Sequence, residues 1–173
     1  MRRRHHYELA FEEYLRARRL PYVAVDEARK ALLPPGEAAP SIKSFDFVIY
    51  GGGENLLAEV KGRRIAGAGR GRLESWVTQE DVDALTRWER LFGPGFTASF
   101  VFLFWFEAQP AAPLFEELIE HRGQWYAVRV VPVREYAKAM RPRSPRWRTV
   151  HLSTADFDRL SRPLCREPGL ATA

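Results

Sequence analysis

The stretch that decides the fold spans residues 45–61 and reads FDFVIYGGGENLLAEVK. Its first part, residues 45–50, is rich in aromatic and β-branched side chains, which are typical of a β-strand. Residues 51–55 contain three consecutive glycines and predict a turn, and residues 56–61 form a second apolar run. Two strands joined by a short glycine-rich turn predict an antiparallel hairpin.

Three charged side chains of this hairpin can meet. Side chains alternate between the two faces of a strand, so Glu59 and Lys61 share one face. Asp46 stands between two phenylalanines and lies, like Glu59, a few residues from the turn, so the hairpin can bring the two carboxylates together. Carboxylates on neighbouring strands suit Mg²⁺ or Mn²⁺. Such an ion can hold a phosphodiester oxygen, while Lys61 orients or deprotonates water or offsets the charge of the transition state.

A simpler interpretation is that Asp46, Glu59 and Lys61 form an exposed ion pair across the hairpin, which would add little stability. We rank it second, because the apolar neighbours of these residues indicate strands that are covered on both faces.

The elements around the hairpin follow from apolar periodicity and from capping residues. Thr78 with Asp81 three positions later predicts a capping box, and Gly93 predicts the end of that helix. Residues 96–106 are apolar on both faces, which predicts a central strand. The remaining expectations are a helix at 6–19, strands at 22–25, 115–120, 124–131 and 147–152, short helices at 26–33, 134–140 and 154–160, and basic loops at 62–75 and 141–148.

With these elements in place, the sequence resembles the PD-(D/E)XK nuclease superfamily. In that pattern an acidic residue on one strand is followed by Glu/Asp-X-Lys on the next, and here Asp46 and Glu59-Val60-Lys61 match. Phe45 stands where the motif's name has proline. The resemblance covers roughly residues 7–106 and implies an α/β fold with a restriction-endonuclease-like αβββαβ core, a mixed central sheet flanked by helices, similar to Holliday-junction resolvases and restriction-type endonucleases.

The resemblance implies a metal-dependent endonuclease that hydrolyses phosphodiester bonds in DNA. Asp46 and Glu59 would hold one or two Mg²⁺ or Mn²⁺ ions, the carbonyl of Val60 would add a ligand, and Lys61 would assist the attacking water.

Two further site residues follow from the resemblance. The helix before the hairpin usually carries another acid, for which the chain offers Glu8 or Glu12, and we favour Glu8 because it faces the same side as Phe11. Many members have a Gln or Lys on the helix after the motif, and Gln79 is the candidate there, although it stands at the very start of its helix.

Charge is consistent with a nucleic-acid partner. The 173 residues carry a net charge of +5, and of the 27 basic residues only Lys30, Lys43, Lys61 and Lys138 are lysines. Guanidinium groups bind phosphate through two parallel hydrogen bonds, which suits an arginine-rich surface to phosphate recognition. Directly after the motif, a loop carries four arginines for which we favour phosphate contact over simple solvation: Arg63, Arg64, Arg70 and Arg72.

The length predicts one domain. We divide it into a nuclease-like core at 1–108, a C-terminal α+β extension at 109–163 packed on the same domain, and a flexible tail at 164–173. The single Cys165 excludes an intrachain disulfide, and the apolar run at 96–106 is too short for a membrane-spanning helix. We therefore expect a cytoplasmic protein without a membrane partner.

The expected partner is nucleic acid, with DNA favoured over RNA, and a homodimer is compatible with the resemblance. Two other functions stay open from the sequence. One is a nucleic-acid-binding module on the same fold that does not cut, and the other is a protein-interaction domain whose working surface lies within residues 109–173.

Overall fold

The predicted hairpin forms and continues into a larger sheet. The computed structural model describes residues 6–25, 42–51, 53–65, 73–107, 109–110 and 117–165. In it, β2 (Phe47–Ile49) pairs antiparallel with β3 (Asn55–Ile65), with Phe47 opposite Ala58. β3 is longer than predicted because it pairs with β5 (Phe96–Phe106) over its whole length, so residues 62–65 lie in a strand and not in the expected loop.

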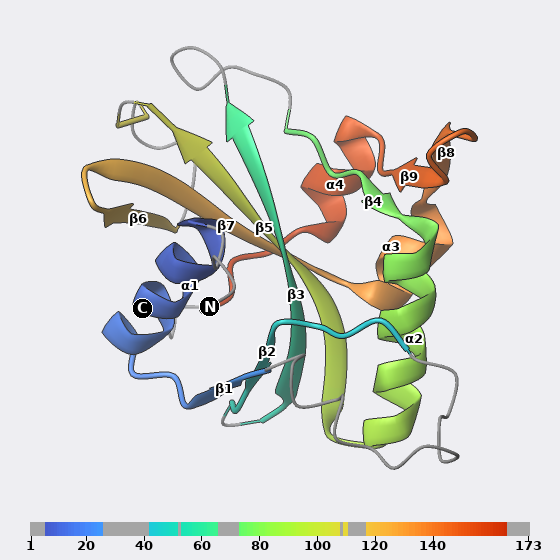
Figure 1. Ribbon diagram of the computed structural model, residues 1–173, viewed down its shortest axis with the longest axis horizontal. Coiled ribbons are helices and arrows are strands. Elements are labelled where there is room, and N and C mark those ends of the chain that lie inside the picture. Colours follow the sequence, from blue (N-terminus) through green and yellow to red (C-terminus); the bar gives the residue numbers. More distant parts are fainter. Residues whose placement is uncertain are drawn as a thin grey trace, which may run out of the picture.

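The main sheet has six strands in the order β1-β2-β3-β5-β7-β6 (Figure 1). β5 lies in its centre, as its two apolar faces predict, parallel to β3 and antiparallel to β7. The sheet is therefore mixed. The edge strands are β1 (Tyr22–Ala24) and β6 (Leu118–His121), and β7 (Gln124–Pro132) lies between β5 and β6.

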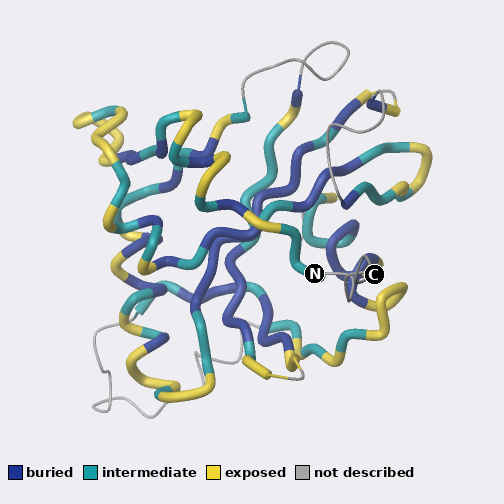
Figure 2. The backbone as a smooth tube through the Cα atoms, turned by 180° about the vertical axis from the view of Figure 1, so that it is seen from behind, coloured by how far each residue is buried: buried dark blue, intermediate teal, exposed yellow. Residues whose placement is uncertain are grey.

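Helices cover both faces of this sheet. On one face α1 (His6–Ala17) packs Phe11 and Leu15 against alternate residues of β3 and β5, among them Ala58 and Val101. On the other face lie α2 (Gln79–Phe92), α3 (Val133–Ala139) and α4 (Thr154–Leu160). Figure 2 shows the buried residues concentrated along the central strands between these layers.

The capping box of α2 is confirmed. The hydroxyl of Thr78 accepts a hydrogen bond from the Asp81 amide at 3.1 Å, and the Asp81 carboxylate accepts one from the Thr78 amide at 2.9 Å. Gly93, with φ 77°, follows the last residue of the helix, as predicted. The box fixes where α2 begins, and so fixes the position of Asp81 relative to the sheet.

A second, three-stranded sheet joins the start of α2 to the C-terminal part of the chain. β9 (Thr149–His151) pairs antiparallel with both β4 (Val77–Thr78) and β8 (Arg141–Ser144). The expectation of a loop at 141–148 is wrong for its first half. Proline is tolerated on an edge strand, and β8 is an edge strand with an irregularity between Pro142 and Ser144.

The extension after residue 109 adds strands to the same sheet, since β7 pairs with β5 along eight positions from Ser99 to Phe106. The expected strand at 115–120 begins at Leu118, and the expected helix at 26–33 lies outside the described residues. At the far end, the amides of Leu164 and Cys165 donate to the buried Glu117 carboxylate at 2.8 and 3.0 Å. None of the helices in the described ranges combines the length and the apolar character needed to cross a membrane.

The contact between α1 and β3 gives a prediction about stability. A Cβ added at Gly62 would lie 2.1 Å from Cδ2 of the Tyr7 ring, far inside van der Waals contact. We expect Gly62→Ala to lower the free energy of unfolding by about 1–3 kcal/mol, measured by urea denaturation.

The control is the same substitution in a Tyr7→Ala background, where the space is open and the cost should largely disappear. Equal costs in both backgrounds would show that the Tyr7 ring does not require a glycine at this position.

Candidate active site

Asp46 is positioned by the point at which its strand leaves the sheet. The register that pairs Phe47 with Ala58 would place Asp46 opposite Glu59 at the next position. At that point the regular ladder ends, because the Asp46 amide donates to the Ala58 carbonyl at 2.9 Å. The Asp46 carboxylate then accepts a hydrogen bond from the Val60 amide at 2.7 Å. Asp46 is thereby held against the Glu59-Val60-Lys61 segment.

Glu59 and Lys61 form a buried ion pair on the face of the sheet that packs against α2. Lys61 Nζ lies 2.8 Å from Glu59 Oε1, and their side chains are only 16% and 10% exposed. The interpretation as an exposed ion pair is therefore wrong, since the apolar strands and helices on both sides of the sheet cover these residues. The structure brings together Asp46, Glu59 and Lys61.

Two more charged residues, not anticipated from the sequence, complete the cluster. Asp81 Oδ2 lies 2.9 Å from Lys61 Nζ, and the other oxygen of the same carboxylate pairs with Lys43. The capping box pointed to Asp81 only as a helix start. Its contact with Lys61 depends on how α2 packs on the sheet through Val82 and Leu85, which no local pattern reveals.

Burial and charge shift the pKa of Glu59 upward. Removal of the carboxylate from water raises its pKa, and the neighbouring Asp46 charge raises it further, while Lys61 lowers it; the balance brings the pKa to about 7. A perturbed carboxylic acid beside a second carboxylate is typical of sites that bind cations or transfer protons.

The pKa of Asp81 is lowered, in contrast to that of Glu59. Burial alone would raise its pKa, but the charges of Lys61 and Lys43 and the hydrogen bond from the Thr78 amide outweigh it and lower the pKa to about 2. The two acids that contact Lys61 therefore differ in kind, because Asp81 stays ionised while Glu59 gives up its charge easily. Asp81 can hold the lysine ammonium in place whatever the state of Glu59.

The chemistry of the donors fits a hard divalent cation. Within the described part of the chain, no three Asp, Glu, His or Cys side chains gather closely enough to form a metal-binding group. The cluster does supply two carboxylates, those of Asp46 and Glu59, next to the backbone carbonyl of Val60. Mg²⁺ is commonly held by one or two carboxylates and keeps several waters. Burial is the main cause of the raised pKa of Glu59, and a cation would relieve the repulsion from Asp46 that adds to it.

The other two residues that the resemblance implies, Glu8 and Gln79, lie on the two helices that flank the sheet. Glu8 is half-buried on α1, next to Tyr7, whose ring contacts β3 at Gly62, one residue after Lys61. Gln79 is the first residue of α2, and its amide group donates to the exposed Asp83 at 3.0 Å. Asp81 contacts Lys61 from the helix where Gln79 was expected to act.

The four arginines predicted to bind phosphate lie in different surroundings. Arg63 is used within the protein, since its guanidinium lies 4.0 Å from the centroid of the Trp76 ring and donates to the carbonyls of Gly62 and Trp76. Arg64 is exposed and pairs with Glu107. Arg70 and Arg72 lie outside the described residues.

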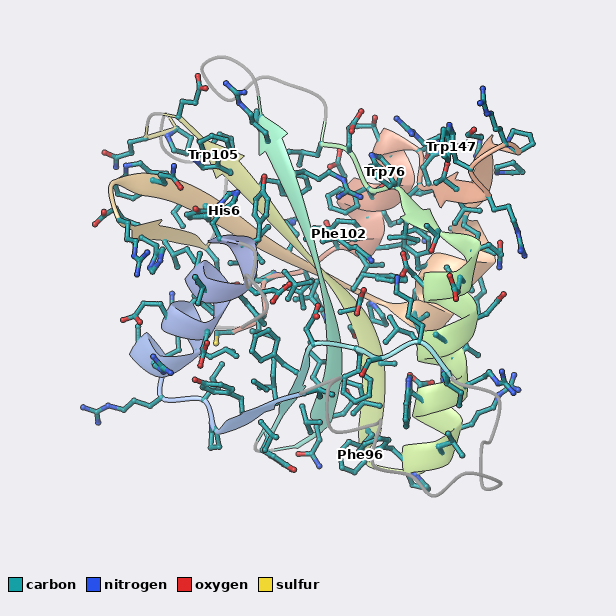
Figure 3. The ribbon with its side chains drawn as sticks, in the orientation of Figure 1. His6, Trp76, Phe96, Phe102, Trp105 and Trp147 are labelled. Carbon is teal, nitrogen blue, oxygen red and sulfur yellow. The ribbon has the colours of Figure 1, made fainter. Side chains whose placement is uncertain are left out.

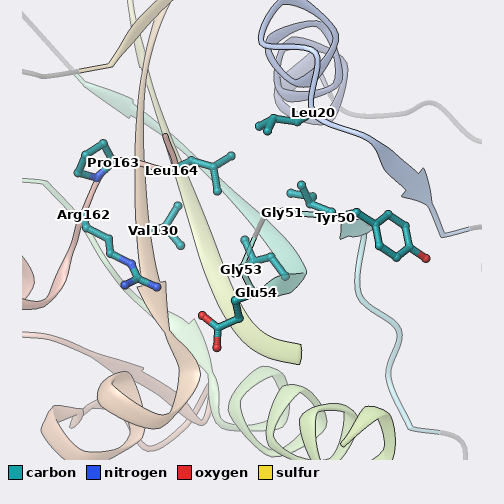
Figure 4. Close-up of a pocket in the computed structure, with 11 residues that line it drawn as sticks. Leu20, Tyr50, Gly51, Gly53, Glu54, Val130, Arg162, Pro163 and Leu164 are labelled. Atoms are coloured by element: carbon teal, nitrogen blue, oxygen red, sulfur yellow. The ribbon is translucent and has the colours of Figure 1, made fainter. Parts of the chain in front are cut away.

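A pocket of about 480 Å³ lies elsewhere, on the face of the sheet that α1 covers (Figure 4). Apolar and aromatic residues line it, among them Leu20, Tyr50, Val130 and Leu164. Two charged residues, Glu54 and Arg162, line it as well. None of the residues of the charged cluster lines it, so the cluster and this pocket are separate features.

Comparison with known proteins shows the fold. No protein-family model matches the chain, and no curated protein matches it in sequence. Among solved structures, the chain is similar to the Holliday junction resolvase Hjc from the archaeal hyperthermophile Archaeoglobus fulgidus, with a TM-score of 0.52 and 14% identity over 92% of this chain and 89% of that one. This match confirms the predicted fold class, a mixed α/β fold of the restriction-endonuclease-like kind.

The raised pKa of Glu59 predicts how stability depends on pH. The folded protein holds a proton on Glu59 up to about pH 7, whereas the unfolded chain releases it near 4.5, so the wild type loses stability as pH rises between these values. Glutamine does not titrate. We expect the stability of Glu59→Gln relative to wild type to increase by about 1–3 kcal/mol from pH 5 to pH 8 in a metal chelator, measured by urea denaturation.

The matched control is Glu13→Gln on the exposed side of α1. Its stability should differ from that of the wild type by the same amount at every pH. If the Glu59→Gln curve also runs parallel to wild type, Glu59 is not the acid described above.

Proposed function

We propose that the protein is a metal-dependent nuclease that hydrolyses phosphodiester bonds in DNA. The observation that carries this proposal is the proximity of the half-buried Asp46, just before β2, to the buried Glu59 of β3, with the ammonium of Lys61 2.8 Å from Glu59. A cluster of this kind costs stability, because burial opposes every one of its charges. Its cost is understandable in a site where a cation and a negatively charged substrate bind.

In this proposal Asp46, Glu59 and the Val60 carbonyl hold one or two Mg²⁺ or Mn²⁺ ions. When bound, such an ion lowers the pKa of a coordinated water and neutralises charge on the phosphate. The residues of the chain provide the rest: the hydrogen bond from the Val60 amide orients Asp46, and burial excludes bulk water from Glu59.

Lys61 has a separate task. Its ammonium donates to the attacking water or to a phosphate oxygen, and so stabilises the negative charge that builds up in the transition state. Asp81 is a positioning residue, because it holds the Nζ atom of Lys61 at 2.9 Å and stays ionised over the working pH range. Lys43 shares that carboxylate and adds a second positive charge.

The outer parts of the proposed site follow the resemblance. Glu8 assists from α1, and Gln79 stands at the start of α2. Arg64, Arg70 and Arg72 contact the phosphates of the bound strand, while the guanidinium of Arg63 stays on Trp76. Arg64 has the exposed position that such a contact needs. We propose DNA as the partner, the cytoplasm as the location and a homodimer as the assembly.

The name of the structural neighbour suggests which DNA to test first. That protein is a Holliday junction resolvase, so we propose branched DNA as the substrate class. A screen should therefore compare four-way junctions and flaps with linear duplex and single-stranded DNA and RNA of the same sequence.

The proposal predicts which substitutions abolish cleavage. With Mg²⁺ or Mn²⁺, Asp46→Asn and Lys61→Ala should each lower the cleavage rate by about a hundredfold or more, because the first removes a metal ligand and the second a proton-transfer and charge-stabilising group. Circular dichroism should show both variants folded, and DNA binding in EDTA should be mostly retained.

Asp158→Asn is the matched control, since it removes an exposed carboxylate from α4 and should cut at the wild-type rate. Cleavage by Asp46→Asn at the wild-type rate refutes the nuclease assignment. DNA binding without cleavage by the wild type, in any metal, points to a binding module on the same fold.

A further inference from the structure

Residues 141–149, which comprise β8, the turn after it and the first residue of β9, form an exposed and strongly basic feature. It reads RPRSPRWRT and contains four arginines and no acidic residue. Its strands belong to the small sheet and not to the main one, and its turn carries Trp147. Figure 3 shows Trp147 and Trp76 at the same end of α2. We call residues 141–149 the basic arm.

Trp147 is exposed more than any other large hydrophobic residue in the described ranges, at 69%. An exposed indole ring gains free energy when another flat or apolar surface covers it. The guanidinium of Arg146 lies 5.4 Å from the ring centroid, and the rest of the ring faces solvent. The tip of the basic arm therefore offers an aromatic surface next to a positive charge.

The arginines of the basic arm are only weakly neutralised by carboxylates. Arg146 and Arg148 pair with no carboxylate of the described residues. Arg141 and Arg143 reach Asp156 and Glu74 only at 3.7 and 3.8 Å, with side chains 66% and 44% exposed. Exposed ion pairs at such distances are weak, so a polyanion can displace them.

Backbone hydrogen bonds join the basic arm to the charged cluster. Thr149 pairs with Thr78, and the Gln79 amide donates to the Arg148 carbonyl at 2.9 Å. Gln79 stands two residues before Asp81, the partner of Lys61. The tip of the basic arm is thus fixed at the same end of α2 as the candidate active site.

A stack of side chains makes a second connection. Trp76 has the guanidinium of Arg143 from β8 at 5.2 Å and that of Arg63 from β3 at 4.0 Å from its ring centroid. Arg63 follows Lys61 by two residues. Trp76 therefore holds β8 against the strand that carries the catalytic motif, which limits how far the basic arm can move from the site.

We propose that the basic arm binds nucleic acid, with its arginines on backbone phosphates and Trp147 stacked on an unpaired base beside the cleavage site. The inference rests on the proposed function and adds the kind of substrate that the site selects. Guanidinium groups recognise phosphate, and an exposed indole recognises the face of a base. Paired bases hide that face inside a duplex, so the aromatic contact favours DNA with unpaired bases.

The test measures binding without cleavage. Two fluorescently labelled DNA probes are titrated in EDTA with protein carrying Asp46→Asn: a blunt duplex, and the same duplex with a short single-stranded gap. We expect Trp147→Ala to weaken binding to the gapped probe by about tenfold, and to the blunt duplex by less than about twofold. Trp147→Phe should keep most of the affinity, since phenylalanine also stacks.

The arginines are tested by salt. Arg146→Gln combined with Arg148→Gln should reduce the slope of log Kd against log salt concentration by about 1–2, for both probes alike. The matched controls are Leu91→Ala and Arg90→Gln, which change an exposed apolar and an exposed basic residue at the other end of α2 and should leave both quantities unchanged.

The outcomes separate this proposal from the nuclease assignment. If Trp147→Ala binds both probes like its parent, or if both probes are weakened equally, the basic arm does not read unpaired bases. If the parent protein binds neither probe, the basic arm is not a nucleic-acid surface at all. Cleavage is judged independently, by comparing wild type with Asp46→Asn, so failure of the basic arm leaves the nuclease assignment standing.

Discussion

The rest of the site depends on one electrostatic constraint: the buried carboxylate of Glu59 is held next to a second carboxylate, that of Asp46. Burial and repulsion from Asp46 both favour the neutral form of Glu59, and they raise its pKa to about 7 although the Lys61 charge lowers it. The ammonium of Lys61 offsets part of this cost, and Asp81 keeps that ammonium in position. Such an arrangement is poorly suited to stability and well suited to binding a cation, which is why we assign it to function.

A few features of the fold bring these charged side chains together. The register of β2 on β3 sets Asp46 beside Glu59, and the Val60 amide fixes the Asp46 carboxylate once the ladder has ended. β5 pairs with β3 along its whole length, so the strand that carries the motif is supported from end to end. The capping box of α2 then serves twice, because the carboxylate of Asp81 that caps the helix also contacts Lys61.

The parts that were predictable from the sequence are those that depend on local patterns. Alternation along a strand placed Glu59 and Lys61 on one face, and Thr78 with Asp81 announced the start of α2. The contact of Asp81 with Lys61 was not predictable, because it depends on how a helix packs against a distant strand. β8 was missed for the opposite reason: its prolines and arginines have the composition of a loop, and only pairing with β9 makes it a strand. The contact of Arg63 with Trp76 was not predictable either, because residues 62–65 were expected to lie in a loop and not in β3.

The central claim is that Asp46 and Glu59 share a divalent cation, and a crystal of the protein soaked in Mn²⁺ tests it most directly. Anomalous scattering locates the ion without reference to activity, substrate or assembly. The account predicts a strong anomalous peak bonded to carboxylate oxygens of both residues in the wild type, and its loss in crystals of Asp46→Asn. A wild-type crystal saturated with Mn²⁺ that shows no peak between these two side chains would contradict it.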